Sequence, residues 1–195
     1  MATFFHLYLA SASPRRRELL RQIGISFELL KVDVPEIPQA GESPQDFVQR
    51  VALEKARAGK ACLAVDDPHP VLAADTAVIV GEEILGKPGD AAHAKAMLGR
   101  LSGRTHEVMS AVALVGERQE VRLNVTRVTF RPLSAKEIDD YWETGESVDK
   151  AGAYAIQGRA AVFISNINGS YSGVMGLPLF EVATLLREFG IDPLR

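Results

Sequence analysis

Apolar and polar positions alternate in blocks along this chain, and the blocks predict strands and helices in turn. The apolar run at residues 7–10 predicts a buried strand. Ser13 and Pro14 follow it and predict a helix start, with the serine as cap and the proline in the first turn. Residues 26–32 have the pattern of a second strand. A long helix is expected after Ser43, because apolar positions recur there at helical spacing.

The same alternation continues through the rest of the chain. The apolar run 71–74 predicts a short strand that ends at Asp75-Thr76, and strand character resumes at 78–80. Residues 107–115 and 121–130 predict two longer strands that form a hairpin. The remaining elements expected are helices at 90–101, 134–143 and 178–190, and a strand at 161–164.

This order of elements predicts an α/β protein with a mixed sheet flanked by helices. Two lobes with a cleft between them are compatible with it. No linker or composition change separates two domains, so residues 1–195 are expected to form a single domain.

Composition narrows the class of protein. The 195 residues are 47% hydrophobic and 24% charged, which is typical of a globular chain and not of a disordered one. The net charge of −3 argues against a nucleic-acid partner, since such proteins usually carry a basic face. A single cysteine, Cys62, is expected to be a small apolar filler at a helix end. No stretch is apolar enough to span a membrane and no secretory signal is apparent, so a cytoplasmic location is expected.

Residues 11–17 bring several anion-binding groups together. The strand delivers two serine hydroxyls, the free backbone N–H groups of a helix start, and the guanidinium groups of Arg15, Arg16 and Arg17 to one place. Ser13 belongs to this set. The segment therefore predicts a polyphosphate site, and the alternative is a capped surface helix with solvated arginines.

Asp75 is the leading catalytic candidate. It is expected at the end of an apolar strand, where α/β sheets place their ligands, and its carboxylate could bind Mg²⁺ or act as a base. The alternative is an aspartate that caps the following turn. Thr76 beside it is more often only a β-branched strand residue.

Three further charged residues are candidates only in combination. Lys55 lies on the expected long helix, and Lys87 lies in a loop stiffened by a glycine and a proline, which suits an ammonium held against phosphate. Glu36 lies between two prolines and could be a metal ligand. Each alone is more often a solvated surface charge. His106, at the start of a strand, is more often a hydrogen-bonded structural residue.

Two glycine-rich loops, 149–158 and 168–179, combine small residues with tyrosines and amides. This composition suits close approach of the backbone to a flat ligand, and a pair of tight structural turns is the alternative.

Taken together, these segments resemble the Maf family of nucleoside triphosphate pyrophosphatases over nearly the whole chain. Each matching piece is weak alone, but their order and spacing are specific. The pieces are Leu9-Ala10-Ser11-Ala12-Ser13-Pro14-Arg15-Arg16, Glu54-Lys55-Ala56, Ala74-Asp75-Thr76, Gly86-Lys87-Pro88, Ser102-Gly103-Arg104-Thr105-His106, Asp149-Lys150-Ala151-Gly152 and Gly176-Leu177-Pro178-Leu179.

The resemblance implies a fold like that of inosine triphosphate pyrophosphatases, with an elongated mixed sheet and an active-site cleft between lobes. It also implies hydrolysis of a nucleoside triphosphate to the monophosphate and pyrophosphate, dependent on a divalent metal, Mg²⁺ or Mn²⁺. By match, Asp75 is the catalytic acidic residue, Arg15 and Arg16 belong to the phosphate-side motif, and Thr76 and Gln157 set substrate preference.

Within the family, the chain resembles the branch that acts on dTTP and UTP. The sister branch, which acts on 7-methyl-GTP, tends to carry Glu at the position of Gln157. The edge of a uracil or thymine has an N3–H donor flanked by carbonyl acceptors, and an amide can pair with it through one acceptor and one donor. A carboxylate offers only acceptors, which suits the N1–H and amino donors of a guanine. One departure is Ser147, where the family often has proline, and it concerns loop stiffness.

We therefore expect a dTTP/UTP pyrophosphatase in which Asp75 activates water or holds the metal, with Glu36 as a second ligand. Ser13, Arg15, Arg16, Lys55 and Lys87 are expected to bind the triphosphate. The alternatives are a 7-methyl-GTP pyrophosphatase and a nucleotide-binding regulator of cell division with little turnover. A homodimer is compatible with the sequence, which does not decide the oligomeric state.

Overall fold

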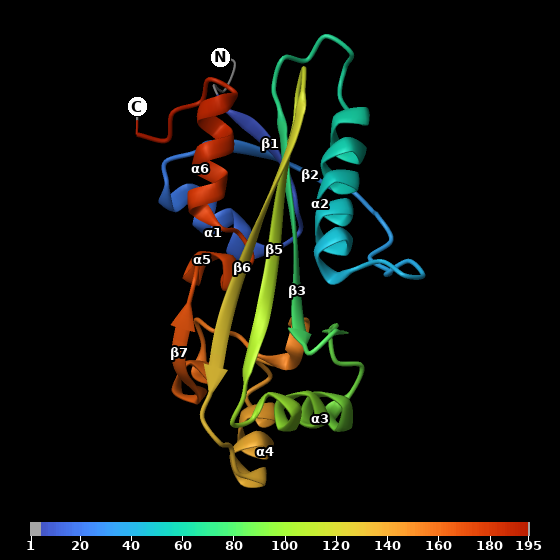
Figure 1. The fold of residues 1–195 in the computed structure, drawn as a ribbon. Coiled ribbons are helices and arrows are strands. Elements are labelled where there is room, and N and C mark those ends of the chain that lie inside the picture. Colours follow the sequence, from blue (N-terminus) through green and yellow to red (C-terminus); the bar gives the residue numbers. More distant parts are fainter. Residues whose placement is uncertain (1–4, 195) are drawn as a thin grey trace.

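The computed structural model describes residues 5–194 and is organised around a seven-stranded mixed sheet (Figure 1). The strands are β1 (Leu7–Ala10), β2 (Phe27–Leu30), β3 (Val71–Val80), β4 (Glu83–Leu85), β5 (Thr105–Val115), β6 (Gln119–Phe130) and β7 (Ile164–Asn168). The helices are α1 (Pro14–Gln22), α2 (Pro44–Ala61), α3 (Ala91–Leu101), α4 (Ala135–Glu143), α5 (Tyr171–Met175) and α6 (Leu179–Glu188), with short 3₁₀ turns η1 (Ala151–Ala153) and η2 (Arg159–Phe163).

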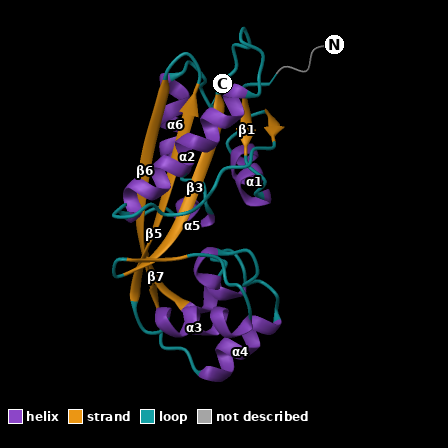
Figure 2. Cartoon of the chain, turned by 90° about the vertical axis from the view of Figure 1, so that its right-hand side faces the viewer, coloured by secondary structure: helices purple, strands orange, loops and turns teal. Residues whose placement is uncertain are grey.

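The sheet is long, and its central strands run through both ends of the molecule. The strand order is β2-β1-β3-β5-β6-β7, with β4 beside β3. β1 pairs in parallel with β2 and β3, and all other pairs are antiparallel. One end carries α1, α2 and α6, and the other carries α3, α4 and β7 (Figures 1 and 2). The expected elongated mixed α/β sheet is confirmed.

Helices cover both faces of the sheet, and the two-residue period of β3 decides which side chains meet them. Ala73 and Ala77 point to the face on which α2 packs, through Val48 and Val51. Ala74 points to the opposite face, where it joins a core formed with α1 and α6. Neighbouring residues of β3 therefore belong to different layers of the molecule.

Two sequence expectations about strands are wrong. β3 does not end at Asp75-Thr76, because β5 pairs with it without interruption from Val71 to Ile79 and holds both residues inside the strand. The strand expected at 161–164 begins only at Ile164, the first residue of β7, and residues 161–163 belong to the 3₁₀ turn η2. Ala160 and Phe163 are buried while Val162 between them is exposed, and this three-residue spacing fits a helical turn.

Other expectations are confirmed. β5 and β6 form the hairpin, and Ser134 opens α4 with a complete capping box.

The expectation that Cys62 is a small apolar filler is wrong. Cys62 does lie at the end of α2, but it is exposed and its thiol donates to the carbonyl of Ala58. No helix within residues 5–194 combines the length and apolarity needed to cross a membrane.

The second end of the molecule has an aromatic core around His106. The imidazole Nε2 lies 2.8 Å from the hydroxyl of Tyr154, and the ring packs edge-on against Phe130. The side chain is 2% exposed and its Nδ1 has no hydrogen-bond partner within the described residues. Burial lowers the pKa of His106 from 6.5 to about 4, so the folded protein holds a neutral imidazole at neutral pH.

His106 should therefore make stability depend on pH. Its folded pKa of about 4 lies below the ordinary value of 6.5, so the unfolded chain takes up this proton first as pH falls. The stabilisation is present above pH 6.5 and is lost between there and pH 4; it amounts to about 3 kcal/mol. The free energy of unfolding, measured with urea at several pH values across this range, should depend less steeply on pH for His106→Gln than for wild type. The same slope for His106→Gln and wild type would refute the assignment.

Candidate active site

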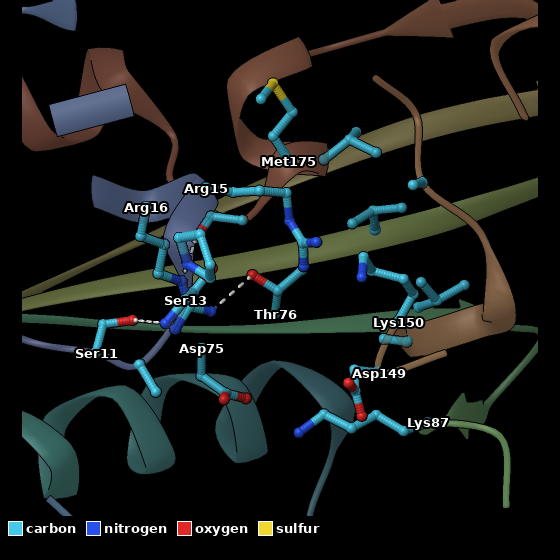
Figure 3. A pocket seen from close by; sticks show the side chains of 18 of the residues that line it. Ser11, Ser13, Arg15, Arg16, Asp75, Thr76, Lys87, Asp149, Lys150 and Met175 are labelled. Carbon is cyan, nitrogen blue, oxygen red and sulfur yellow. Dashed lines mark hydrogen bonds between the residues drawn. The ribbon is translucent and has the colours of Figure 1, made fainter. Parts of the chain in front are cut away.

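The edge of β3 is uncovered for a few residues, and the main cleft lies there. β5 pairs along one edge of the strand. On the other edge, β1 pairs with β3 only as far as Leu72, and β4 begins to pair at Val78. Both faces of the sheet are therefore reachable from this gap. A cleft of about 590 Å³ opens at it (Figure 3). The gap explains how Asp75 and Thr76, which point to opposite faces, both line one cleft.

Four charged side chains lie in a row on the α2 side of the cleft. The ammonium of Lys55 donates to Asp75 Oδ1 at 2.8 Å and also pairs with Glu36. The ammonium of Lys87 lies 3.7 Å from the other carboxylate oxygen of Glu36. Asp75 and Lys55 are buried, and Lys87 is largely exposed. The structure thus brings together four candidates that lie far apart in the sequence.

Burial and charge act in opposite directions on the two carboxylates. Burial raises the pKa of Asp75 above its ordinary value, although Lys55 and Arg16 favour the ionised form. Burial also acts to raise the pKa of Glu36, but the hydrogen bond and charge of Lys55 outweigh it and the pKa is lowered. The pKa of Asp75 is therefore shifted toward the range that suits a general base, whereas the pKa of Glu36 is shifted away from it.

Arg16 is half-buried on the α1 side, and most of its N–H groups are bound by the protein itself. Its guanidinium donates to the carbonyls of Gly176 at 2.8 Å and Ala74 at 2.7 Å, and to the hydroxyl of Thr76 at 3.4 Å. Three of the five N–H groups of an arginine are used in this way. Arg16 therefore ties α1 to the open edge of β3 and to the turn before α6, and two N–H groups remain for a ligand.

The start of α1 lies at the cleft as the sequence predicts. Ser13 caps the helix without a side-chain hydrogen bond, and its backbone N–H donates to Ser11 Oγ at 3.2 Å. The side chain of Arg15 runs along the wall of the cleft beneath Met175 (Figure 3). Arg17 does not line this cleft but a smaller cavity on the side of β2, because successive helical positions point in different directions. Two of the three expected guanidinium groups thus reach the site.

The other half of the cleft holds most of its apolar side chains, together with the charged side chains of Asp149 and Lys150 (Figure 3). The apolar side chains are those of Val78, Val108, Ala155, Ile156, Val174 and Met175. Gln157 also lines it and is exposed to solvent. The segment that carries Gln157 is held against β3 at Gly152, whose N–H donates to the carbonyl of Gly86 at 3.1 Å. A Cβ on Gly152 would lie 2.9 Å from Val78, and its φ of +68° also favours glycine.

Sequence reasoning missed Ser110. It is fully buried on β5, directly opposite Thr76 in the sheet register, and its hydroxyl lies 2.8 Å from that of Thr76. A serine in an apolar strand is the only trace of this contact in the sequence, and the pairing register is needed to connect it with Thr76. The expected position of Asp75 past the end of a strand is also corrected here. It reaches the ligand side because the strand edge is open, not because the strand stops.

The residues present fit a divalent cation that is bound together with a ligand. Asp75 and Glu36 bring two carboxylates to the same ammonium, and Mg²⁺ in nucleotide sites commonly uses one or two carboxylates with phosphate oxygens and water. No group of three or more His, Cys, Asp or Glu side chains suited to a metal occurs among residues 5–194. Asp75 and Glu36 could therefore hold a cation together with a bound ligand.

The fold and the cleft are those of an α/β protein whose cleft, at a break in the sheet edge, combines cationic side chains with apolar ones. The chain belongs to the Maf family, whose Maf-like protein model matches residues 6–189. The dTTP/UTP pyrophosphatase of Alkalilimnicola ehrlichii is 56% identical over 96% of this chain and 94% of its own length. That of Methylococcus capsulatus is 55% identical over 97% and 93%.

Solved structures with partial likeness include a nucleoside-triphosphatase, dITP/XTP pyrophosphatase, from Mycobacterium abscessus. It is 24% identical and has a TM-score of 0.42 over 64% of this chain and 72% of its own. The Ham1 protein of Staphylococcus aureus is 15% identical, with a TM-score of 0.44 over 64% and 71%.

Proposed function

We propose that this protein hydrolyses dTTP and UTP to the nucleoside monophosphate and pyrophosphate. The row formed by Asp75, Lys55, Glu36 and Lys87 at the open edge of β3 is the observation that carries the proposal. It supplies a base, cations for a polyphosphate and carboxylates for a metal within one cleft. The relatives named dTTP/UTP pyrophosphatase support the choice of nucleotide.

In this proposal Asp75 is the general base. Its buried carboxylate, with a raised pKa, orients and deprotonates a water for attack at the α-phosphorus. Lys55 holds Asp75 in place through their 2.8 Å hydrogen bond, and its positive charge also attracts the phosphates of a bound ligand. Removing the substrate from bulk water strengthens each of these charge interactions.

The triphosphate would lie between the two cationic walls of the cleft. On one side are Lys55 and Lys87. On the other are Ser13, Arg15 and the two remaining N–H groups of Arg16, beside the N-terminus of α1. These groups stabilise the negative charge that develops on the leaving pyrophosphate. Glu36 would hold Mg²⁺ or Mn²⁺, which supplies charge neutralisation at the phosphates when bound; Asp75 is a ligand in the alternative in which its carboxylate binds the metal and not the water.

The nucleobase of the substrate would lie in the apolar half of the cleft. Gln157, at the solvent-facing side of that half, offers one acceptor and one donor to the edge of a uracil or thymine. A 7-methyl-GTP pyrophosphatase is not favoured, because an amide stands where that branch tends to have a carboxylate. A binder with little turnover is not favoured either, because the buried base Asp75 and its lysine are intact.

The products of dTTP hydrolysis test the reaction. With Mg²⁺ present, anion-exchange chromatography should resolve dTMP and pyrophosphate, and excess chelator should abolish turnover. Formation of dTDP and orthophosphate would contradict the proposal. Undiminished turnover in chelator would contradict the role given to the metal.

Replacing Asp75 by Asn keeps its size but removes its charge and basicity. Loss of a general base typically lowers kcat by about 10²- to 10⁴-fold. Steady-state kinetics with dTTP should show this loss while the melting temperature stays close to that of wild type. The matched variant Asp139→Asn, on α4 outside the cleft, should leave kcat unchanged. A folded Asp75→Asn protein that keeps more than about a tenth of kcat would make Asp75 structural.

Gln157→Glu tests whether this side chain hydrogen-bonds the uracil or thymine of the nucleotide. The carboxylate still accepts from N3–H of the pyrimidine, but it places a second acceptor against a base carbonyl. Such a mismatch costs about 1–3 kcal/mol, or roughly 5- to 150-fold in kcat/KM. The loss should be similar for dTTP and UTP, which share that edge.

The control for Gln157→Glu is Gln119→Glu at the β5–β6 turn. This substitution should leave kcat/KM unchanged for both dTTP and UTP. Activity of Gln157→Glu on 7-methyl-GTP should be measured alongside, and a gain would support the role of this residue in choosing the nucleotide. Unchanged dTTP and UTP values would mean that Gln157 does not contact the base.

A further inference from the structure

A chain of four polar groups crosses the sheet at the cleft. The guanidinium of Arg16 donates to the hydroxyl of Thr76 at 3.4 Å. That hydroxyl lies 2.8 Å from the hydroxyl of Ser110, which in turn lies 2.7 Å from the carbonyl of Gly173 in α5. Ser110 is fully buried, whereas Thr76 is only partly buried and lines the cleft. Figure 3 shows the bond between Arg16 and Thr76.

The two ends of this chain fix the direction of every hydrogen bond in it. A guanidinium can only donate, and a carbonyl can only accept. Ser110 has one proton, and it is used on the carbonyl of Gly173. Thr76 must therefore donate its own proton to Ser110 while it accepts from Arg16. No proton of the Thr76 hydroxyl is left for the cleft, and toward a ligand this hydroxyl is only an acceptor.

An acceptor-only hydroxyl limits what Thr76 can recognise. Phosphate oxygens are themselves acceptors, so Thr76 does not serve the triphosphate. This step rests on the proposed function: dTTP and UTP share only two hydrogen-bond donors, the 3′-hydroxyl and N3–H. Thr76 is next to Asp75 at the charged half and on the same face as Val78 in the apolar half, while the base edge is assigned to Gln157. The sugar lies between the phosphates and the base, as Thr76 lies between the two halves.

We propose that Ser110 is a positioning residue that holds the Thr76 hydroxyl as an acceptor for the 3′-hydroxyl of the nucleotide. Ser110 makes no contact with the substrate. It takes up the proton of Thr76 and so aims a lone pair at the sugar. The contact favours nucleotides with a free 3′-hydroxyl over those without one.

The test compares kcat/KM for dTTP and for 3′-deoxythymidine triphosphate, which lacks only the 3′-hydroxyl. Wild type should prefer dTTP by about 3- to 10-fold, the range of one net hydrogen bond. Thr76→Val, which is isosteric but has no hydroxyl, should bring the ratio close to one. Ser110→Ala should give a ratio between these two, because the freed Thr76 proton can now turn toward the sugar. In the double variant, the Ser110 change should add nothing to the effect of Thr76→Val.

Thr126→Val is the matched control. Thr126 is a buried hydroxyl on β6 that also holds α5, through the backbone N–H of Ser170 at 2.8 Å, but it does not line the cleft. Its loss should lower the melting temperature and leave the ratio at the wild-type value. A purely structural Ser110 would behave in the same way, so an unchanged ratio in Ser110→Ala would overturn its positioning role.

The remaining outcomes separate this inference from the function on which it rests. If wild type turns over dTTP to dTMP but shows no preference over the 3′-deoxy analogue, only the contact with the sugar is overturned. Discrimination against N3-methyl-dTTP that disappears in Thr76→Val would place the acceptor at the base instead. If dTTP is not turned over at all, the proposed function fails and the inference fails with it. Should Ser110→Ala not fold, the ratio measured for Thr76→Val still decides whether the contact exists.

Discussion

The site depends on one constraint, the uncovered stretch of edge on β3. A strand shows successive side chains to opposite faces of its sheet, and in a continuous sheet those faces are separated by the neighbouring strands. Here β1 stops pairing at Leu72 and β4 starts at Val78, so no strand of the described residues separates the two faces between them. One ligand can therefore contact Asp75 from the α2 layer and Thr76 from the α1 layer. On the closed edge, β5 keeps the strand rigid over the same residues.

The buried lysine makes this arrangement stable without a ligand. A carboxylate as buried as Asp75 would be costly if it had no partner, and Lys55 supplies the partner at 2.8 Å while also pairing with Glu36. An incoming polyanion competes for the same ammonium, and an incoming cation competes for the same carboxylates. The row of alternating charges is thus matched to a ligand that carries both, such as a nucleotide with its metal.

Much of this could be predicted from the sequence where the signals are local. The caps at Ser13 and Ser134 and the β5–β6 hairpin are set by neighbouring residues, so their patterns suffice. Asp75 does line the cleft, but the predicted end of its strand is wrong, since the sequence does not reveal that β5 continues past this residue. Ser110 was missed for the same reason, because its partner Thr76 lies 34 positions away and is known only from the strand register.

The remaining errors arise from similar competition between local and tertiary signals. Residues 161–164 contain apolar residues typical of a strand, but burial of Ala160 and Phe163 on one side favours a 3₁₀ turn. Arg16 shows the reverse case. Its sequence motif indicates a phosphate ligand, whereas three of its N–H groups are bound by protein oxygens, and this makes it a tie between α1, β3 and the turn before α6.

The central claim is that a water activated at Asp75, on the open edge of β3, attacks the α-phosphorus. Hydrolysis of dTTP in ¹⁸O-labelled water, followed by mass spectrometry of both products, tests it directly. The account predicts that the label appears in dTMP and that the pyrophosphate is unlabelled. Label in the pyrophosphate would place the attack at the β-phosphorus and contradict the geometry assigned to Asp75.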